Sequence, residues 1–448
     1  MTPDMQQLRQ EMHDVEQAVA DALAYAKQLG GSAVECAISR SRGINVGTRL
    51  GEVETVEFNQ DGALGITLYR GQQKGSSSTT DLTPSAIRAA VEKANDIARF
   101  TSPDPFAGLA PEAAMAIQIP DLDLCHPADQ SAEFALQQAL ACERHALSLD
   151  PRIVNSDGAG YSSHVGYRVY GNSHGFLAGY LQSRHSLSCS LIAKSGEAMQ
   201  RDYSYTVARH RDQLWSPEQV ARDAVEATVA RLDSRKIATA KVPVIFRADV
   251  ANSLFGHLVG AISGGNLYRK SSFLLDHLGQ QVLPSWLTIS EQPHLRGALA
   301  SSPFDQEGVA TVDRDIISNG VLQSYLMTSY SARKLGLQPT GHAGGIHTWQ
   351  VGHNALSLQA MCRDMGTGLL VTELMGQGVN LLTGDYSRGA AGFWVENGEI
   401  QFPVEEITIA GNLKDMFANI VAIGNDVDLR HGVRTGSVWI ESMRLAGV

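Results

Sequence analysis

The sequence predicts an α+β protein in which each half combines helices with mainly antiparallel strands. Runs rich in Val, Ile and Thr are separated by short breaks of Gly, Asn and Asp, which favours antiparallel meanders over parallel sheets. Amphipathic segments stand before and between these runs. We therefore expect an N-terminal half of helices on an antiparallel sheet and a C-terminal half that is mostly antiparallel β with a few helices.

The N-terminal half begins with a predicted amphipathic helix over residues 5–29, which Gly30 ends. A second helix is predicted over residues 84–99, with Thr83 at the N-cap and Pro84 at the first helical position. The strands expected between these helices cover residues 33–40, 44–50, 53–58, 63–70 and 74–80.

The remaining elements follow in the same alternation. Residues 102–122 carry Ser-Pro-Asp-Pro and Ile-Pro-Asp and are predicted to be an irregular connection. The later predicted elements are a helix over 130–148, strands between 152 and 210, a helix over 216–232, a strand over Val242–Phe246 and a helix over about 249–262. With a break near 233–240, we expect domains at 1–235, with a sub-boundary near 102–122, and at 236–448.

Composition excludes several classes of protein. The 448 residues are 43% apolar and carry a net charge of −11, without a Lys/Arg-rich run, which disfavours direct nucleic-acid binding. No basic and apolar leader opens the chain, and no run of about 18 apolar residues predicts a membrane span. The five cysteines form no CxxC pair, which is typical of a reduced cytoplasmic protein.

Two short motifs point to ordinary structure. Gly171-Asn172-Ser173-His174-Gly175 matches the G-x-S-x-G pattern of serine hydrolases, but strand-like runs flank it on both sides. A hairpin turn is the better interpretation of Asn and Gly in that position. No glycine-rich segment has the spacing of a nucleotide-binding loop.

A histidine cluster has to be weighed as a metal site. His342, His347 and His353 lie close in sequence, and neutral imidazoles bind zinc. Gly344 and Gly345 predict a loop between them, so no helix face presents two rings together. Glu373 and Asp385 would have to come from elsewhere. We favour a polar loop lining a cleft or a partner surface.

The helix after Val242–Phe246 carries the most informative residues. Zinc peptidases place His and Glu side chains on such a helix, where the glutamate takes a proton from metal-bound water. Here His257 is followed by Leu258, and position 262 is Ile. A catalytic zinc needs about three protein ligands, so His257 by itself is better interpreted as a partly buried, hydrogen-bonded helix histidine.

Several longer segments together resemble a known family from end to end. The chain is similar to the PmbA/TldE branch of the TldD/PmbA metallopeptidase family, also described as modulators of DNA gyrase. The segments that carry the resemblance are Val53–Asn59, Asp61–Ile66, Thr101–Pro105, Leu254–Ile262, Tyr268–Lys270, Thr328–Gly336, Thr340–Gly345, Gly384–Gly392 and Gly411–Met416.

The resemblance implies a degenerate metal site in this chain. In the catalytic TldD-type branch, a helix carries His-Glu-x-x-x-His, and a cysteine near the C-terminus is a third ligand. These positions fall on His257, Leu258, Ile262 and, near Gly436, Thr435. Two of three ligands and the general base would be absent, so we expect no catalytic residue, no metal and no cofactor in this chain.

The family also implies a partner and a substrate class. A TldD-like subunit would hold zinc, and this chain would complete a chamber for short or unfolded peptides, including microcin leader peptides. An effect on gyrase would be indirect. Extended peptides can bind as an added strand, and Arg333 or Arg388 could hold a peptide carboxylate. The expected peptide-binding residues are Tyr268, Arg269, Arg333, His342, His347, Asp385 and Arg388.

Three alternatives stay open at this point. The chain could be a catalytic metallopeptidase itself, with ligands such as His342, His347 and Asp385. It could instead be a non-proteolytic regulator acting on gyrase-related targets. A homodimeric peptide-binding scaffold is the third, since the predicted apolar sheet faces permit a homodimer when the chain is alone.

Overall fold

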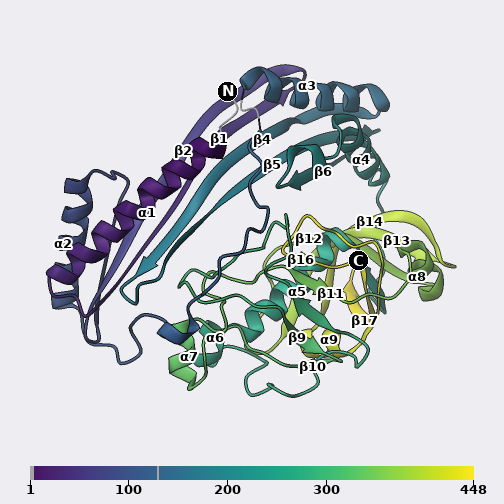
Figure 1. Ribbon diagram of the computed structural model, residues 1–448. Helices are drawn as coiled ribbons and strands as arrows, with labels where there is room; N and C mark the ends of the chain where they lie inside the picture. Colours follow the sequence, from purple (N-terminus) through teal and green to yellow (C-terminus); the bar gives the residue numbers. More distant parts are fainter. Residues whose placement is uncertain (1–4, 129–130, 448) are drawn as a thin grey trace.

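The computed structural model describes residues 5–128 and 131–447. Its class is α+β, as the sequence predicts, and its N-terminal half is one long sheet with helices packed on it (Figure 1). The elements of this half are α1 (Met5–Gln28), β1 (Ala33–Arg49), β2 (Glu52–Arg70), β3 (Gln73–Thr79), α2 (Pro84–Phe100), a 3₁₀ turn (Glu112–Ala114), α3 (Ala132–Leu149), β4 (Ile153–Asn172), β5 (Leu177–Ser195), β6 (Ala198–Ala208), a 3₁₀ turn (Arg211–Gln213) and α4 (Pro217–Ala230).

The N-terminal sheet has the strand order β3-β2-β1-β4-β5-β6, and all its pairs are antiparallel. Even-numbered apolar residues of β1 face the helices: Cys36 packs with α1 and α2, and Val46 packs with α3 and α4. Both helix pairs therefore cover the same face. The opposite face contacts the C-terminal half, where Tyr170 packs with Phe304. Figure 1 shows the C-terminal half on the other side of the sheet from α1 and α3.

The predicted breaks within the first strands are wrong. The predicted strands 33–40 and 44–50 form one strand, β1, which ends at Arg49, and residues 53–58 and 63–70 belong to one strand, β2. Gly43 does not end a strand, because its missing side chain lets β4 come close. A Cβ at Gly43 would lie 2.2 Å from the Ser163 carbonyl oxygen. Glycine here permits close backbone approach and does not mark a turn.

The predicted helices and turns of this half agree with the structure. Pro84 opens α2 after Thr83, although the Thr83 side chain makes no capping hydrogen bond. Residue 130, where the next helix is predicted to start, lies outside the described residues, and α3 begins at Ala132. Residues 102–122 are irregular apart from the turn at Glu112–Ala114. The G-x-S-x-G segment is the β4–β5 turn.

The C-terminal half is richer in short elements. They are β7 (Ala240–Phe246), α5 (Ala248–Ile262), α6 (Gly264–Tyr268), β8 (Ile289–Glu291), β9 (Arg314–Ser318), β10 (Val321–Leu322), α7 (Ser329–Leu335), β11 (Trp349–Val351), α8 (Leu358–Met365), β12 (Gly368–Met375), β13 (Asp385–Glu396), β14 (Glu399–Asn412), α9 (Leu413–Ala418), β15 (Ile420–Ile423), β16 (Val433–Arg434) and β17 (Val438–Ala446).

Two sheets enclose the core of the C-terminal half. One has the order β14-β13-β12-β7-β17-β15 and closes on itself through a further β14–β17 pairing. The other has the order β10-β9-β8-β11-β16. Most pairs are antiparallel, as expected, but β7–β12 and β11–β16 are parallel. Long connections allow this pairing, and α5 lies within the β7–β12 connection.

None of the helices in residues 5–128 and 131–447 combines the length and apolar composition that a bilayer crossing requires. The division into domains at 1–235 and 236–448 stays a prediction.

Candidate functional site

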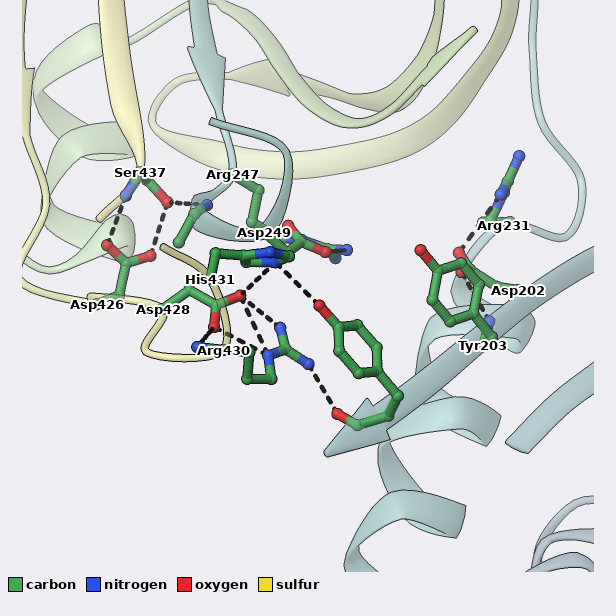
Figure 2. Close-up of polar contacts among 12 residues, drawn as sticks. Asp202, Tyr203, Arg231, Arg247, Asp249, Asp426, Asp428, Arg430, His431 and Ser437 are labelled. Atoms are coloured by element: carbon green, nitrogen blue, oxygen red, sulfur yellow. Dashed lines mark hydrogen bonds and ion pairs between the residues drawn. The ribbon is translucent and has the colours of Figure 1, made fainter. Parts of the chain in front are cut away.

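Helix α5 follows β7 directly and is anchored at its first turn. The Ala248 backbone N–H donates to the Ser437 hydroxyl, and Ser437 donates to the Asp426 carboxylate at 2.6 Å. Figure 2 shows Asp426 and Ser437 joined in this way beside the start of the helix. The residue just before β17 therefore anchors the first turn of α5.

His257 lies near the middle of α5 and is partly exposed. Its ring meets the Tyr386 ring edge-on, with the centroids 5.9 Å apart. The Nε2 atom is buried and, among the described residues, has no hydrogen-bond partner. Burial and the nearby Arg388 guanidinium lower the pKa of His257, so the imidazole is neutral at pH 7. The expected hydrogen bond at Nε2 is absent from the described residues.

The other positions predicted for the degenerate metal site are buried. Leu258 and Ile262 are 0% exposed, and both belong to the main hydrophobic core. Thr435 is also 0% exposed, and its hydroxyl donates to the Gly436 carbonyl. In the described part of the chain, no three or more His, Cys, Asp or Glu side chains lie together in a way that could hold a metal ion. One imidazole beside a tyrosine, an arginine and apolar side chains does not fit a hydrolytic zinc ion.

The histidine cluster is a buried network around a carboxylate that the sequence did not indicate, Glu291. His342 Nε2 lies 2.8 Å from Glu291 Oε2, while the His347 backbone N–H and Trp349 Nε1 donate to Oε1 at 2.9 and 3.0 Å. Arg314 Nε is 4.0 Å from Oε2. These hydrogen bonds and the two imidazoles hold the pKa of Glu291 below its usual value despite burial, whereas burial lowers the pKa of His347.

The segment was predicted to be a polar loop that lines a cleft or a partner surface, and two of its three histidines are buried within the chain. His342 is 5% exposed and His347 is 6% exposed, and their ring nitrogens are engaged with Thr340, Glu291 and the Gly341 carbonyl. His353 alone is exposed. A buried carboxylate attracts nearby donors, which is why the loop folds inward. No sequence pattern marked Glu291 as its centre.

Asp385 does not join these histidines in a metal site. It lies at the start of β13, where its carboxylate accepts hydrogen bonds from the Thr383 hydroxyl at 2.7 Å and from the Asn412 amide at 3.3 Å. Glu373, the other acid considered, forms an ion pair with Arg231 at 2.5 Å. Both acids therefore have other partners.

Arg333 connects the two halves of the molecule. From α7, its guanidinium donates to the carbonyls of Phe106, Gly108 and Leu109 at 2.7–2.9 Å, which fastens the irregular connection to the C-terminal half. The planar fork of arginine suits three carbonyls at once. This cation is therefore already used by the chain's own backbone.

Arg333→Lys is expected to destabilise the protein by about 2 kcal/mol, since an ammonium cannot reach three carbonyls in one plane. Urea unfolding measures the change, and limited proteolysis should cut the 102–116 connection faster. The matched control is Arg269→Lys, because Arg269 is exposed and bonds only locally to Asn266 and Tyr268. If the two variants were equally stable, Arg333 would not fasten the 102–116 connection to the C-terminal half.

The remaining predicted peptide-binding residues are more accessible. Tyr268 ends α6 and packs edge-on against Tyr330, with Arg269 over its ring. Arg388 lies on β13 beside Tyr386 and His257. Burial raises the pKa of Tyr386 to about 12. Among the predicted residues, the Arg388 charge therefore acts on the His257 ring.

A second polar cluster joins β6 to the loop before β16 (Figure 2). Asp428 accepts a bidentate pair from Arg430 at 2.9 and 2.7 Å, and Arg430 also donates to the Tyr205 carbonyl. The Tyr205 hydroxyl and His431 Nε2 are 2.9 Å apart. Sequence reasoning missed this cluster. The Asp-Leu-Arg-His order was visible, but Tyr205 is remote in the chain.

Comparison with known proteins places this geometry in a family. Models of the PmbA/TldA metallopeptidase match the chain with domain 1 at residues 34–98, the central domain at 125–232 and the C-terminal domain at 239–447. The Metalloprotease PmbA of Escherichia coli O157:H7 is 58% identical, over 97% of this chain and 96% of its own length.

The chain belongs to the PmbA/TldD metallopeptidase family. Solved structures share its fold. A modulator of DNA gyrase from Bacteroides thetaiotaomicron superposes with a TM-score of 0.90 at 27% identity, covering 96% of this chain and 98% of that one. TldE from Thermococcus kodakarensis superposes with a TM-score of 0.83 at 20% identity, covering 96% of this chain and 100% of that one. At this identity the similarity establishes a shared fold and nothing more.

PmbA/TldD metallopeptidases are metal-dependent as a family, and the α5 positions of this member do not suit that metal. We therefore assign no step of peptide hydrolysis to the residues of this chain.

Proposed function

We propose that this chain is the non-catalytic, TldE-type subunit of a two-subunit TldD/TldE peptidase. A TldD-like partner would hold the zinc ion, and this chain would complete the chamber that encloses short or unfolded peptides. The observation that carries the proposal is that α5 has too few metal-binding side chains. Leu258 and Ile262 occupy the positions where a carboxylate and an imidazole would be needed, and both are 0% exposed. A peptidase member without these groups needs them from another chain.

Peptide contact is assigned to the accessible residues of the predicted set. Tyr268 ends α6 and Arg269 caps it, while Asp385 and Arg388 lie on β13. All four are partly or fully exposed. Arg333, His342 and His347 are left out, because each is engaged within the chain. A cytoplasmic location is part of the proposal, supported by five cysteines that form no disulfide.

The test is a peptidase assay of this chain, of a TldD-like subunit and of their mixture, with an unstructured casein peptide as substrate and zinc content measured for each. We expect hydrolysis in the mixture, with zinc bound to the TldD-like subunit. Hydrolysis by this chain alone with stoichiometric zinc would overturn the proposal. A mixture no more active than the TldD-like subunit would do so as well.

A further inference from the structure

The outer half of β2 is an open sheet edge. Strand β3 pairs only with Leu64–Arg70, so residues 52–63 have β1 on one side and, among the described residues, no strand on the other. Every residue from Glu52 to Asp61 is exposed. An edge of this length presents backbone N–H and C=O groups that can pair with another chain.

The apolar face of the sheet continues onto this edge without a cover. Val56 pairs with Val46 and Phe58 pairs with Ile44, so these side chains share the face on which α3 packs. Val46 and Ile44 are 4% and 0% exposed, whereas Val56 and Phe58 are 40% and 69% exposed. The covering helix therefore stops before the apolar surface does. Apolar side chains beside an open edge are typical of a protein interface.

Charge decides what kind of strand fits this edge. Glu52, Glu54, Glu57 and Asp61 lie on it, and positions 50–69 contain no Lys, Arg or His. Within the described residues, none of these four carboxylates forms an ion pair. Pairing with β2 of a second copy would bring two acidic strands together, which is repulsive. A strand that carries Lys or Arg suits the edge instead.

We propose that β2 residues 52–63 receive a β-strand from the TldD-like partner subunit, and that this strand places basic side chains against the carboxylates and apolar ones on Val56 and Phe58. This inference rests on the proposed function. It makes the N-terminal sheet continuous between subunits and gives a physical reason for a heteromer over a homodimer.

The experiment measures the affinity of the full-length chain for the TldD-like subunit by analytical ultracentrifugation and by surface plasmon resonance, each at two salt concentrations. Phe58→Ser and the double variant E54K/E57K should each weaken binding about tenfold or more. Wild-type binding should weaken at high salt. Matched controls are Phe100→Ser, at another exposed Phe (89%), and E396K/E399K, in the exposed β13–β14 hairpin. Thermal unfolding should be unchanged, because these side chains are exposed.

The outcomes separate this inference from the proposed function. If the wild-type chain binds the TldD-like subunit and both β2 variants bind equally well, the edge is not the docking strand. If the chain alone forms a homodimer that Phe58→Ser dissociates, a second copy occupies the edge and the inference is wrong. If the wild-type chain does not bind a TldD-like subunit at all, the proposed function fails first.

Discussion

Leu258→Glu is expected to lower the free energy of unfolding by about 4 kcal/mol, because it buries a carboxyl group without a partner. Leu258 is 0% exposed and packs in the main core of the C-terminal half. A carboxylate there loses its water and finds no cation, so it would take up a proton instead. Denaturant unfolding at pH 7 measures the loss.

The control for this substitution is Asn252→Glu on the same helix, where the side chain is partly exposed and a carboxylate stays hydrated. It should change stability by less than about 0.5 kcal/mol. If Leu258→Glu left the free energy of unfolding unchanged, water would have to reach position 258.

The same helix tests the alignment with the catalytic branch. In the triple variant Leu258→Glu, Ile262→His and Thr435→Cys, zinc should recover part of the lost stability, since a metal that binds only the folded state stabilises it. Zinc should not raise the melting temperature of the wild type. If zinc has no effect on the triple variant either, the alignment or the space around His257 is wrong.

Glu291→Ala is the second substitution with a large expected effect, about 3–5 kcal/mol, because it removes the acceptor at the centre of a buried network. His342, the His347 N–H and Trp349 would each lose a partner at 3.0 Å or less. Burial without hydrogen bonds costs each of these groups its hydration. Urea unfolding and tryptophan fluorescence report the change.

Glu291→Gln is the informative companion. An amide oxygen still accepts from His347 and Trp349, and the His342 ring can change tautomer to accept from the amide nitrogen. This variant should lose less than half as much stability as Glu291→Ala. Glu396→Ala, at an exposed turn, should be nearly neutral. If Glu291→Ala were equally neutral, the network would not stabilise the loop that carries His342 and His347 against β8.

The two substitutions replace side chains in two different buried environments of the C-terminal half. At Leu258 the core is apolar, and a charge has no counterpart. At Glu291 a charge is present and is surrounded by donors. This contrast explains why the histidines at 342 and 347 are structural while His257 has an unused ring nitrogen.

The sequence by itself determined the α+β class and, within about two residues, the boundaries of the five longest helices, whereas the short helices α6 to α9 were not predicted. It also determined that positions 258 and 262 carry Leu and Ile. These features depend on local periodicity, on capping residues and on residue identity, which are all visible along the chain. The β4–β5 turn at Ser173 was predictable for the same reason.

Only the tertiary structure decided which residues meet. It joined the predicted short strands into β1 and β2, because Gly43 faces a neighbouring strand and not a turn. It brought Glu291 to two histidines more than 50 positions away and turned Arg333 onto the connection at Phe106. Hydrogen bonds and core packing act between residues that are distant in sequence, and no local pattern records the pairing.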